Sequence, residues 1–378
     1  MNEQLYTIAL SLIKGLSLVN VKEIYERVNS AMELFEYHKD IRQLIPDASP
    51  QMVEAIASLD FYLPQAEREI EFAQNKKIKI LCLNDESYPY RLRDCIDAPI
   101  VLYTMGNTNF NVHHVVSIVG TRKCTEYGRD ICKYFISDLK RYFPDILIVS
   151  GLAYGIDINS HRAALANGMN TVGVLAHGFG RHIYPQIHRQ TAIEMLLHGG
   201  LLTEFTNGVS PERYNFVQRN RIIAGLSDAT IVVESAYRGG SLITADIASS
   251  YNRDVFAFPG RIYDQCSEGC NRLLKEQRAV AIQNAEDFIT SMCWDIESGL
   301  INRDSSTNKS NQLELFEVLS DNEKKIIKTL TGVDDKMINQ IVIETGLNFN
   351  IVSSTLFDLE MKGLVKVLGG ARYKICPL

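Results

Sequence analysis

Short runs of consecutive apolar residues alternate with stretches of helical length between residues 115 and 258. Six runs are predicted to be buried strands: Val115 to Val119, Ile146 to Val149, Thr171 to Leu175, Leu201 to Thr203, Ala229 to Val233 and Val255 to Phe258. Apolar strands separated by helices are typical of a parallel sheet that is covered on both faces. The pattern predicts an α/β fold with a doubly wound parallel sheet, in which ligands bind at the carboxyl ends of the strands.

Apolar residues also recur at near-helical spacing at the start of the chain, for example at Leu10, Ile13 and Leu16. This spacing predicts a small helical domain over residues 1–62. Basic residues are few here, so a helix-hairpin-helix or SAM-like nucleic-acid module and a plain packing or dimerisation module fit equally well. A helix and two strands, Ile78 to Leu83 and Ile100 to Tyr103, are predicted before the first of the six strands.

Residues 297–312 are polar and rich in serine and asparagine, which predicts a linker. Three helical stretches follow it, and then two short strands joined through Gly369 and Gly370. Three helices with a hairpin are typical of a winged helix. The predicted organisation is a helical domain, a Rossmann-like core, a linker and a winged-helix domain, at 1–62, 63–296, 297–312 and 313–378.

The last predicted domain contains eight Lys and Arg against nine Asp and Glu. Its third helix contains Asp358 and Glu360, with only Lys362 near its end. A helix that reads DNA is normally basic. We therefore expect a protein-contact module, and the alternative of a transcriptional regulator is disfavoured.

The composition is that of an ordinary soluble globular protein, with 378 residues, 46% of them apolar, and a formal net charge of −6. This charge argues against a surface coated with positive charge, but a local basic groove fits it, because binding depends on the field at the site. We find no apolar run of about 18 residues and no signal peptide, and expect a cytoplasmic protein without a membrane partner. The eight cysteines include no CxxC pair, so we expect no disulfide framework, no metal and no cofactor.

Candidate chemistry is densest between residues 211 and 271, where two of the predicted strands bracket a helix that begins at Gly239, Gly240 and Ser241. Glycines at a helix N-terminus expose backbone N–H groups, which favour anions. Clustered arginines offer planar forks that suit phosphate. The polar cluster before the first of these two strands contains Arg213, Arg219, Asn220 and Arg221. The pattern predicts a phosphate-binding crevice without an obvious nucleophile.

The first of the six strands is followed by Gly120, Thr121 and Arg122, without the GxGxxG spacing of dinucleotide-binding proteins. A glycine here lets the backbone approach a ligand closely, and Arg122 is expected to project from the carboxyl edge of the sheet toward a phosphate. Gly151 follows the second strand and is expected to allow a similar approach. Asp157 lies in the first turn of the next helix, where we expect a capping or packing role.

Phe216 lies between Arg213 and Arg219. An aromatic residue among basic ones is typical of proteins that stack the bases of single-stranded nucleic acid. A core position for Phe216 fits the sequence equally well. Arg219 and Arg221 are two residues apart, so they point to different sides of a helix and at most one can lie squarely on the sheet.

Three histidines, His177, His182 and His188, follow the third strand. Their spacing crosses two glycines and a proline without a carboxylate, which disfavours a metal site and favours ordinary polar contacts, with Arg181 as a candidate for phosphate. Glu204 and Glu234 lie near strand ends, where each could serve acid–base chemistry or bind a neighbouring arginine. We identify no catalytic residue from spacing.

Five motifs resemble the DNA-processing protein A family, also called DprA or Smf. They occur in order along the chain: SIVGTRKCTEYG at 117–128, SGLAYGIDINSH at 150–161, FVQRNRIIAGLSDATIVVESAYRGGSLITADIA at 216–248, FAFPGR at 256–261 and SEGCNRLL at 267–274. The RNRIIAGLS run within the third motif is highly specific. Two segments depart from the family pattern, QRAV at 277–280 and the loop at 182–190.

The resemblance implies a homodimer that binds single-stranded DNA without sequence preference and catalyses no reaction. It also implies that such a protein protects incoming DNA during natural transformation and helps to load the RecA recombinase, with single-strand-binding protein as a further candidate partner. The family pocket maps onto Arg122, and the basic and aromatic residues map onto Arg213, Phe216, Arg219 and Arg221. The complete expected DNA-binding set is Gly120, Thr121, Arg122, Gly151, Arg213, Phe216, Arg219, Asn220, Arg221, Gly240 and Ser241.

One alternative function is enzymatic. Related Rossmann-like folds cleave nucleotide N-glycosidic bonds, and Glu234 could act in such a reaction. The PGGxGTxxE element is absent from this sequence, which argues against the alternative.

Overall fold

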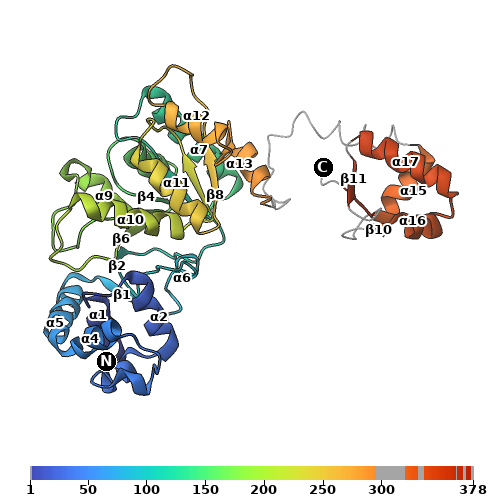
Figure 1. Cartoon of the computed structure of the whole chain (residues 1–378). Helices are drawn as coiled ribbons and strands as arrows, with labels where there is room; N and C mark the ends of the chain where they lie inside the picture. Colours follow the sequence, from blue (N-terminus) through green and yellow to red (C-terminus); the bar gives the residue numbers. More distant parts are fainter. Residues whose placement is uncertain (1, 295–319, 331–335, 363, 369–371, 376–378) are drawn as a thin grey trace. The chain divides into compact units, whose positions relative to one another are not determined.

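The chain forms two compact units, Met1–Glu297 and Ser298–Leu378 (Figure 1). The structure, a computed structural model, describes residues 2–294, 320–330, 336–362, 364–368 and 372–375. The predicted linker and the Gly369–Gly370 turn lie outside these residues.

Helices form the first part of the first unit. The α-helices are α1 (Asn2–Ser11), α2 (Leu18–Val28), α3 (Ala31–Glu36), α4 (Pro50–Ala57) and α5 (Leu59–Lys76). Serine side chains start three of them: Ser17, Ser30 and Ser49 each accept a hydrogen bond from the backbone N–H three residues further on. The predicted N-terminal helical region is confirmed. Its predicted boundary at residues 62 and 63 falls inside α5, and the division into separate domains stays a prediction.

A nine-stranded sheet forms the centre of the described part of this unit. Its strands are β1 (Lys79–Cys82), β2 (Val101–Gly106), β3 (Val115–Val119), β4 (Leu147–Ser150), β5 (Thr171–Val174), β6 (Gly199–Thr203), β7 (Ala229–Val232), β8 (Asp254–Ala257) and β9 (Val280–Ala281). Their order is β1-β2-β6-β5-β4-β3-β7-β8-β9. The strands from β3 to β9 pair in parallel, whereas β1 and β2 extend the β6 edge in antiparallel pairing.

The prediction of a mostly parallel α/β sheet is confirmed, with two differences. All six strands predicted in the alternating region form, with ends shifted by at most two residues. The two earlier predicted strands join the same sheet in antiparallel pairing, which an apolar pattern alone does not determine. Strand β9 was not predicted; it is only two residues long, and both residues are exposed.

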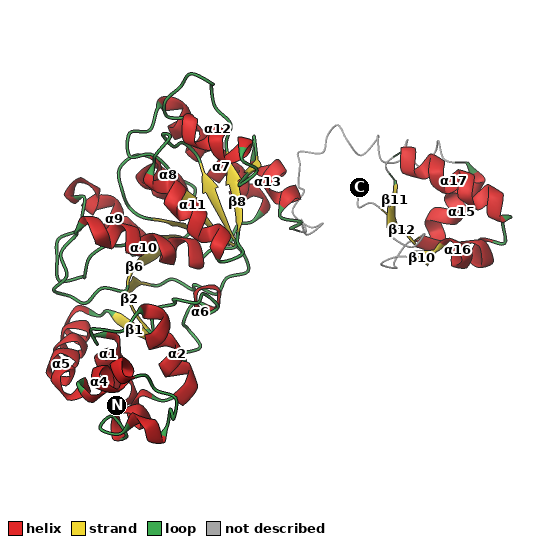
Figure 2. Cartoon of the chain, viewed as in Figure 1, coloured by secondary structure: helices red, strands yellow, loops and turns green. Residues whose placement is uncertain are grey.

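Helices cover both faces of the sheet (Figure 2). On one face lie α7 (Glu126–Tyr142), α8 (Ile156–Ala166) and α13 (Ala285–Ser291), and on the other lie α10 (Arg213–Gly225) and α11 (Gly240–Ser250). Successive strand side chains point to opposite faces. Accordingly Val116 packs in the same core cluster as Phe135 of α7, and Val115 packs in the same cluster as Ile222 of α10.

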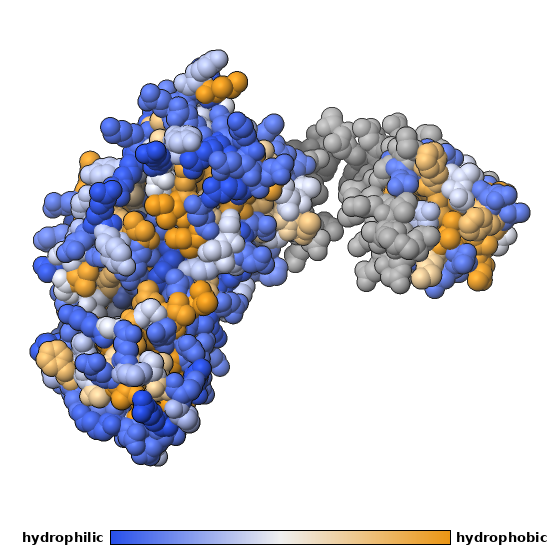
Figure 3. All heavy atoms as spheres, viewed as in Figure 1, coloured by the Kyte–Doolittle hydropathy of each residue, from blue (hydrophilic) through white to orange (hydrophobic). Residues whose placement is uncertain are grey.

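The outer surface of the first unit is mainly hydrophilic on the face seen in Figure 3, where apolar side chains are scattered among polar ones. Such a surface is expected when the apolar sides of the helices face the sheet. The buried apolar side chains accordingly gather between the helices and the strands.

The direction in which strands are added reverses beside β3. From β3 the chain adds β4, β5 and β6 on one side, and then α10 returns it so that β7 pairs with the other side of β3. Loops that follow the two strands flanking such a reversal diverge, and ligands of open α/β sheets bind in the resulting crevice. Here the crevice is bordered by the residues after β3 and β7.

The second unit contains three α-helices among its described residues: α15 (Asp321–Leu330), α16 (Ile338–Thr345) and α17 (Phe349–Met361). Strands β10 (Lys336–Met337), β11 (Val365–Leu368) and β12 (Arg372–Ile375) form an antiparallel sheet in the order β10-β12-β11. Met337 is the extended N-cap residue of α16, and it also pairs with Arg372 of β12. None of the helices described in either unit has the length and apolar content needed to cross a membrane.

Candidate functional site

The loops that follow β3, β4 and β7 pack tightly against one another. Thr121 donates its backbone N–H to the carbonyl of Glu234, at 2.7 Å, and accepts a hydrogen bond from the backbone N–H of Ile156. Glycine permits this approach: a Cβ at Gly120 would lie 2.4 Å from Ile156 Cγ1, and one at Gly155 would lie 2.1 Å from Thr121 O. The packed turn leaves Arg122 exposed at the carboxyl edge, as predicted.

Glu234, which follows β7, forms hydrogen bonds with the N-cap residue of α7, Thr125. Its buried carboxylate accepts hydrogen bonds from the Thr125 hydroxyl, at 2.5 Å, and from the Thr125 backbone N–H, at 2.9 Å. A Cβ at Gly128 would lie 2.2 Å from Glu234 Oε2, so glycine is required beside the carboxylate. Both carboxylate oxygens therefore bond to the helix N-terminus, rather than to an arginine as one sequence interpretation allowed.

Phe216 lies between two guanidinium groups. Its ring centre is 5.2 Å from Arg122 Cζ and 5.8 Å from Arg219 Cζ, and Tyr184 contacts it edge to face at 5.6 Å. Phe216 is half-buried, and it belongs to none of the apolar core clusters of the described residues. Cations at these distances are attracted to an aromatic ring, so the three side chains support one another at the exposed edge.

Arg219 is buried beneath Phe216, with 3% of its surface exposed. Its Nη1 donates to the carbonyls of Gly151, at 2.6 Å, and Val174, which ties together the ends of β4 and β5. A Cβ at Gly151 would lie 2.4 Å from this nitrogen, so the expected close approach at Gly151 is to a protein side chain. Burial lowers the pKa of Arg219 to about 10 despite the nearby charge of Asp157, so the group remains a cation at neutral pH.

Asp157 supports the same arrangement from α8. Its carboxylate accepts a hydrogen bond from the backbone N–H of Gly151, at 3.2 Å. Burial raises the pKa of Asp157, and the charge of Arg219 opposes this shift. This geometry fits the capping or packing role expected from the sequence.

Arg221 is also buried, but it faces a different neighbour, as the two-residue spacing predicted. Its guanidinium group donates to the Glu204 carboxylate and to the carbonyl of Asp97. Glu204 thus binds an arginine, one of its two predicted roles. Burial raises the pKa of Glu204, and Arg221 opposes this rise. The structure places Arg221 in a structural ion pair rather than at the surface.

The remaining expected residues lie along the same edge with different exposures. Arg213 is exposed in the first turn of α10, and Asn220 is half-buried. Gly240 is exposed, whereas Ser241 is buried and donates to the Ser235 hydroxyl at 2.9 Å. A Cβ at Gly240 would have no atom within 4 Å, so a larger residue fits there. A Cβ at Gly239 would lie 2.2 Å from Ser235 Oγ, so glycine is required at that position.

The sequence interpretation missed two aromatic residues, Tyr154 and Tyr184. Both are partly exposed at this edge, and Tyr154 contacts the ring of His188 edge to face at 5.0 Å. Both residues lie in segments that follow predicted strands, Tyr154 after Val149 and Tyr184 after Leu175, and this position was the available signal. His188 binds the carbonyl of Leu152 at 2.9 Å, which gives this histidine a structural role.

Arg181, a sequence candidate for phosphate, binds the protein itself. Its Nε and Nη2 donate to the carbonyl of Gly208, at 2.9 and 2.7 Å. His177 lies in the same loop and is buried, and burial lowers the pKa of its imidazole. These contacts stabilise the loop between β5 and α9 (Arg189–Met195).

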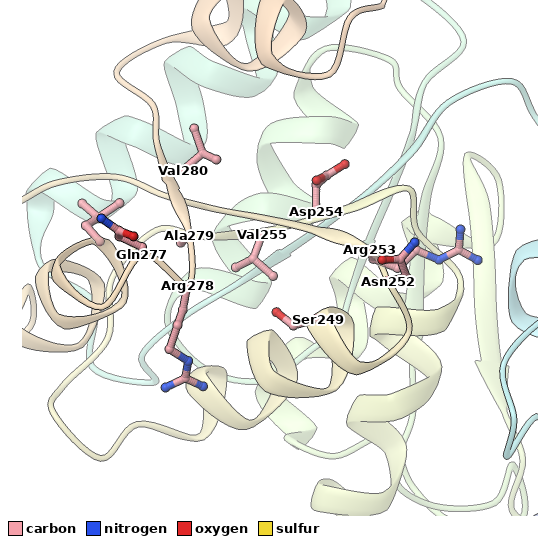
Figure 4. Close-up of a pocket in the computed structure, with 10 residues that line it drawn as sticks. Ser249, Asn252, Arg253, Asp254, Val255, Gln277, Arg278, Ala279 and Val280 are labelled. Atoms are coloured by element: carbon pink, nitrogen blue, oxygen red, sulfur yellow. The ribbon is translucent and has the colours of Figure 1, made fainter.

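Two pockets of the first unit lie at the amino ends of strands, away from Arg122. One, of about 420 Å³, lies at the start of β8 beside β9, with Ser249, Asp254 and Val280 among its lining residues (Figure 4). The other, of about 440 Å³, includes His114, Asp228 and Trp294. The loops at the carboxyl edge, in contrast, form an exposed basic and aromatic surface.

The sequence model of the DNA recombination-mediator protein A family matches residues 79–293, which include this entire edge. The chain belongs to the DNA recombination-mediator protein A family. This finding confirms the resemblance found in the motifs. The protein Smf from Synechocystis, a relative in this DprA/Smf family, is 31% identical across 99% of this chain and 99% of its own length.

Two solved structures of DprA proteins are similar to this one. DNA processing protein A from Streptococcus pneumoniae has 32% sequence identity, with a TM-score of 0.64 over 77% of this chain and 97% of that chain. DNA processing protein A from Helicobacter pylori has 28% identity, with a TM-score of 0.52 over 57% of this chain and 96% of that chain. The Helicobacter structure is described as giving insights into a single-stranded DNA binding mode of that protein.

Proposed function

We propose that this DprA-family protein binds single-stranded DNA without sequence preference and mediates recombination without catalysing a reaction. The observation that supports the proposal best is the position of Phe216 between the guanidinium groups of Arg122 and Arg219 at the carboxyl edge. The single-stranded DNA binding mode of the Helicobacter relative supports the same choice of ligand.

In this proposal the exposed and buried residues have different roles. A base stacks on Phe216, and the exposed Arg122 and Arg213 contact phosphates. Arg219 adds a positive charge beneath the ring, and Arg221 maintains the structure through its ion pair with Glu204. Gly120, Thr121, Asn220 and Gly240 extend this surface, and the buried Gly151 and Ser241 support it from below.

Stacking and phosphate contacts explain why no sequence preference is expected. Every base has an aromatic face, and phosphates are the same at every position of the strand. Affinity should therefore depend on salt and on strand length more than on base order.

We propose the absence of catalysis because the hydrogen bonds of the Glu234 carboxylate are already made within the protein. An N-glycosidase would need this carboxylate to activate water or to stabilise charge on the sugar. Both of its oxygens instead accept hydrogen bonds from Thr125. Incubation of the wild-type protein with nucleotides should release no free base. Sustained release that is abolished in Glu234→Gln would overturn this part of the proposal.

The wider role follows from family membership. We propose a homodimer that protects incoming DNA during natural transformation and helps to load RecA, with single-strand-binding protein as a further partner. We propose that the second unit is a winged helix used for protein contacts, because α17 contains the acidic residues Asp358 and Glu360. A cytoplasmic location and the predicted domain boundaries remain part of the same proposal.

Fluorescence anisotropy with labelled oligonucleotides tests the proposed ligand. Single strands of different sequence should bind with similar affinity and more tightly than a duplex of the same length. The logarithm of the binding constant should fall linearly with the logarithm of salt concentration, with a slope of about −0.7 per phosphate neutralised. Equal binding of duplex and single strand, or affinity that is independent of salt, would contradict the proposal.

A further inference from the structure

A second set of exposed basic and aromatic side chains lies at the carboxyl ends of β7 and β8. Tyr237 and Arg238 follow β7, and Arg261 and Tyr263 follow β8. The side chain of Tyr237 is 52% exposed and that of Tyr263 is 97% exposed. Arg238 and Arg261 are exposed and form no ion pair with the part of the chain that the structure describes.

The ring of Tyr237, like that of Phe216, has an arginine against it. The guanidinium group of Arg272, from α12 (Glu268–Lys275), lies over this ring with its Cζ 4.6 Å from the ring centre. Arg272 is half-buried, and its charge is only weakly opposed by Glu276, at 3.8 Å. In both places an arginine lies against an aromatic ring that is partly open to solvent: the buried Arg219 at Phe216 and the half-buried Arg272 at Tyr237.

The second set is continuous with the surface around Arg122. The loop at 259–267 projects beyond the sheet (top of Figure 1) and contacts the residues around Arg122. Cys266 Sγ lies 3.6 Å from the carbonyl of Lys123, and the Tyr127 hydroxyl donates to the carbonyl of Pro259 at 2.8 Å. Lys123 is itself exposed, so positive charge extends from Arg122 toward this loop.

Exposed cations without ion pairs are notable in a chain of net charge −6. Unpaired arginines beside solvent-exposed tyrosines match the chemistry of a nucleic-acid strand, in which phosphates alternate with aromatic bases. The one carboxylate within this loop, that of Asp264, accepts a hydrogen bond from the Cys266 backbone N–H at 2.9 Å.

We infer that Tyr237, Arg238, Arg261 and Tyr263 form a second single-stranded DNA subsite, which binds the continuation of the strand held at Phe216. The inference rests on the proposed function, since it assigns a longer path to the same ligand. A short oligonucleotide occupies only the first subsite, which is formed by Phe216, Arg122 and Arg213. A longer strand passes over Arg122 and Lys123 and reaches the second subsite.

The test compares two strand lengths, roughly 5 and 20 nucleotides, with the full-length protein in anisotropy titrations at several salt concentrations. The variant Arg238→Ala/Arg261→Ala removes the charges, and Tyr237→Ala/Tyr263→Ala removes the rings. Control substitutions on α7 remove one arginine and one tyrosine elsewhere: Arg141→Ala in its last turn, where Arg141 lies 3.8 Å from Asp138, and Tyr134→Ala at an exposed position. Phe216→Ala reports on the first subsite.

We expect the ring variant to weaken binding of the long strand at least about fivefold. The charge variant should reduce the magnitude of the salt slope for the long strand by about 1.4, or about 0.7 for each phosphate that is no longer neutralised. Both variants should bind the short strand like the wild type, and both controls should bind either strand like the wild type.

Two results would overturn the inference, and they are distinguishable. If the wild type binds both strands and Phe216→Ala weakens both, but the two second-subsite variants match their controls on the long strand, the second subsite alone is wrong. If the wild type binds neither strand, the proposed function fails together with the inference.

Discussion

At the scale of single residues, Phe216 is the side chain on which the proposed binding depends most. Its replacement by alanine should weaken single-stranded DNA binding by about 1–3 kcal/mol, because one stacked base no longer has its platform. Phe216→Tyr should retain most of the affinity, since it keeps the ring. Anisotropy titrations measure the affinities, and thermal melting shows whether each variant is folded. A folded Phe216→Ala protein that binds like the wild type would show that Phe216 does not stack a base.

His161 makes a prediction about acid stability. Its imidazole is fully buried, and burial lowers its pKa to about 3. Thr171 donates its hydroxyl proton to the carbonyl of Ile148, so His161 Nδ1 is the donor in the 2.7 Å contact between the ring and this hydroxyl. The unfolded chain titrates near pH 6.5 at this residue. The unfolded state therefore binds more protons below pH 6.5, and stability is lost as the pH falls from there toward 3.

Between pH 7 and pH 5 this histidine should contribute a loss of about 2 kcal/mol in the free energy of unfolding. His161→Gln does not titrate, so its stability should fall less over the same interval. Chemical denaturation at the two pH values measures the difference. Equal losses in the wild type and in His161→Gln would contradict a neutral buried imidazole.

The exposure of Arg122 could be predicted from its local sequence, whereas the burial of Arg219 and Arg221 could not. A glycine turn after a buried strand brings the next side chains to the sheet edge, and this is a local property. Arg219 is buried because its guanidinium group meets the carbonyl of Gly151, and Arg221 because it meets Glu204. These partners come from other segments, and spacing along the chain does not show which arginine finds one.

At the scale of secondary structure, the Arg122 loop depends on the start of α8. Gly155 has φ of +76°, and a Cβ there would lie 2.1 Å from Thr121 O and 2.7 Å from the carbonyl carbon of Arg122. Gly155→Ala should therefore displace the loop, destabilise the protein by about 1–3 kcal/mol and weaken single-stranded DNA binding.

Gly168 offers a matched control for this substitution. It also has a positive φ, of +63°, but no atom lies within 4 Å of a Cβ built there. Gly168→Ala should cost about 1 kcal/mol through backbone strain and leave DNA affinity unchanged. Denaturation and anisotropy measure both effects. If both variants lose binding equally, the loss reflects general destabilisation and not the position of Arg122.

The central strands were predictable because both of their faces are covered, which makes each a continuous apolar run. The pairing of β1 and β2 depends on contacts with β6 that are distant in sequence, so the apolar pattern indicated the strands but not their direction. The short strands β9 and β10 are two residues each, too few to show a period. Their formation depends on neighbouring strands.

At the scale of the whole molecule, the two compact units allow a truncation test. The proposed DNA surface lies entirely within the first unit. A chain that ends at Glu297 should therefore fold and bind single-stranded DNA within about twofold of the full-length affinity, because a compact domain retains its own core. Circular dichroism and anisotropy measure both properties. A folded truncation that no longer binds would assign a DNA-contact role to the second unit.

Photo-crosslinking tests the location of the DNA most directly. Single strands that contain bromouracil are irradiated with the full-length protein, and mass spectrometry identifies the crosslinked peptides. We expect crosslinks at Phe216 and Tyr184, the two rings in contact at the carboxyl edge. Crosslinks confined to Trp294 and Tyr90, which line a pocket at the amino ends of the strands, would contradict the proposed surface.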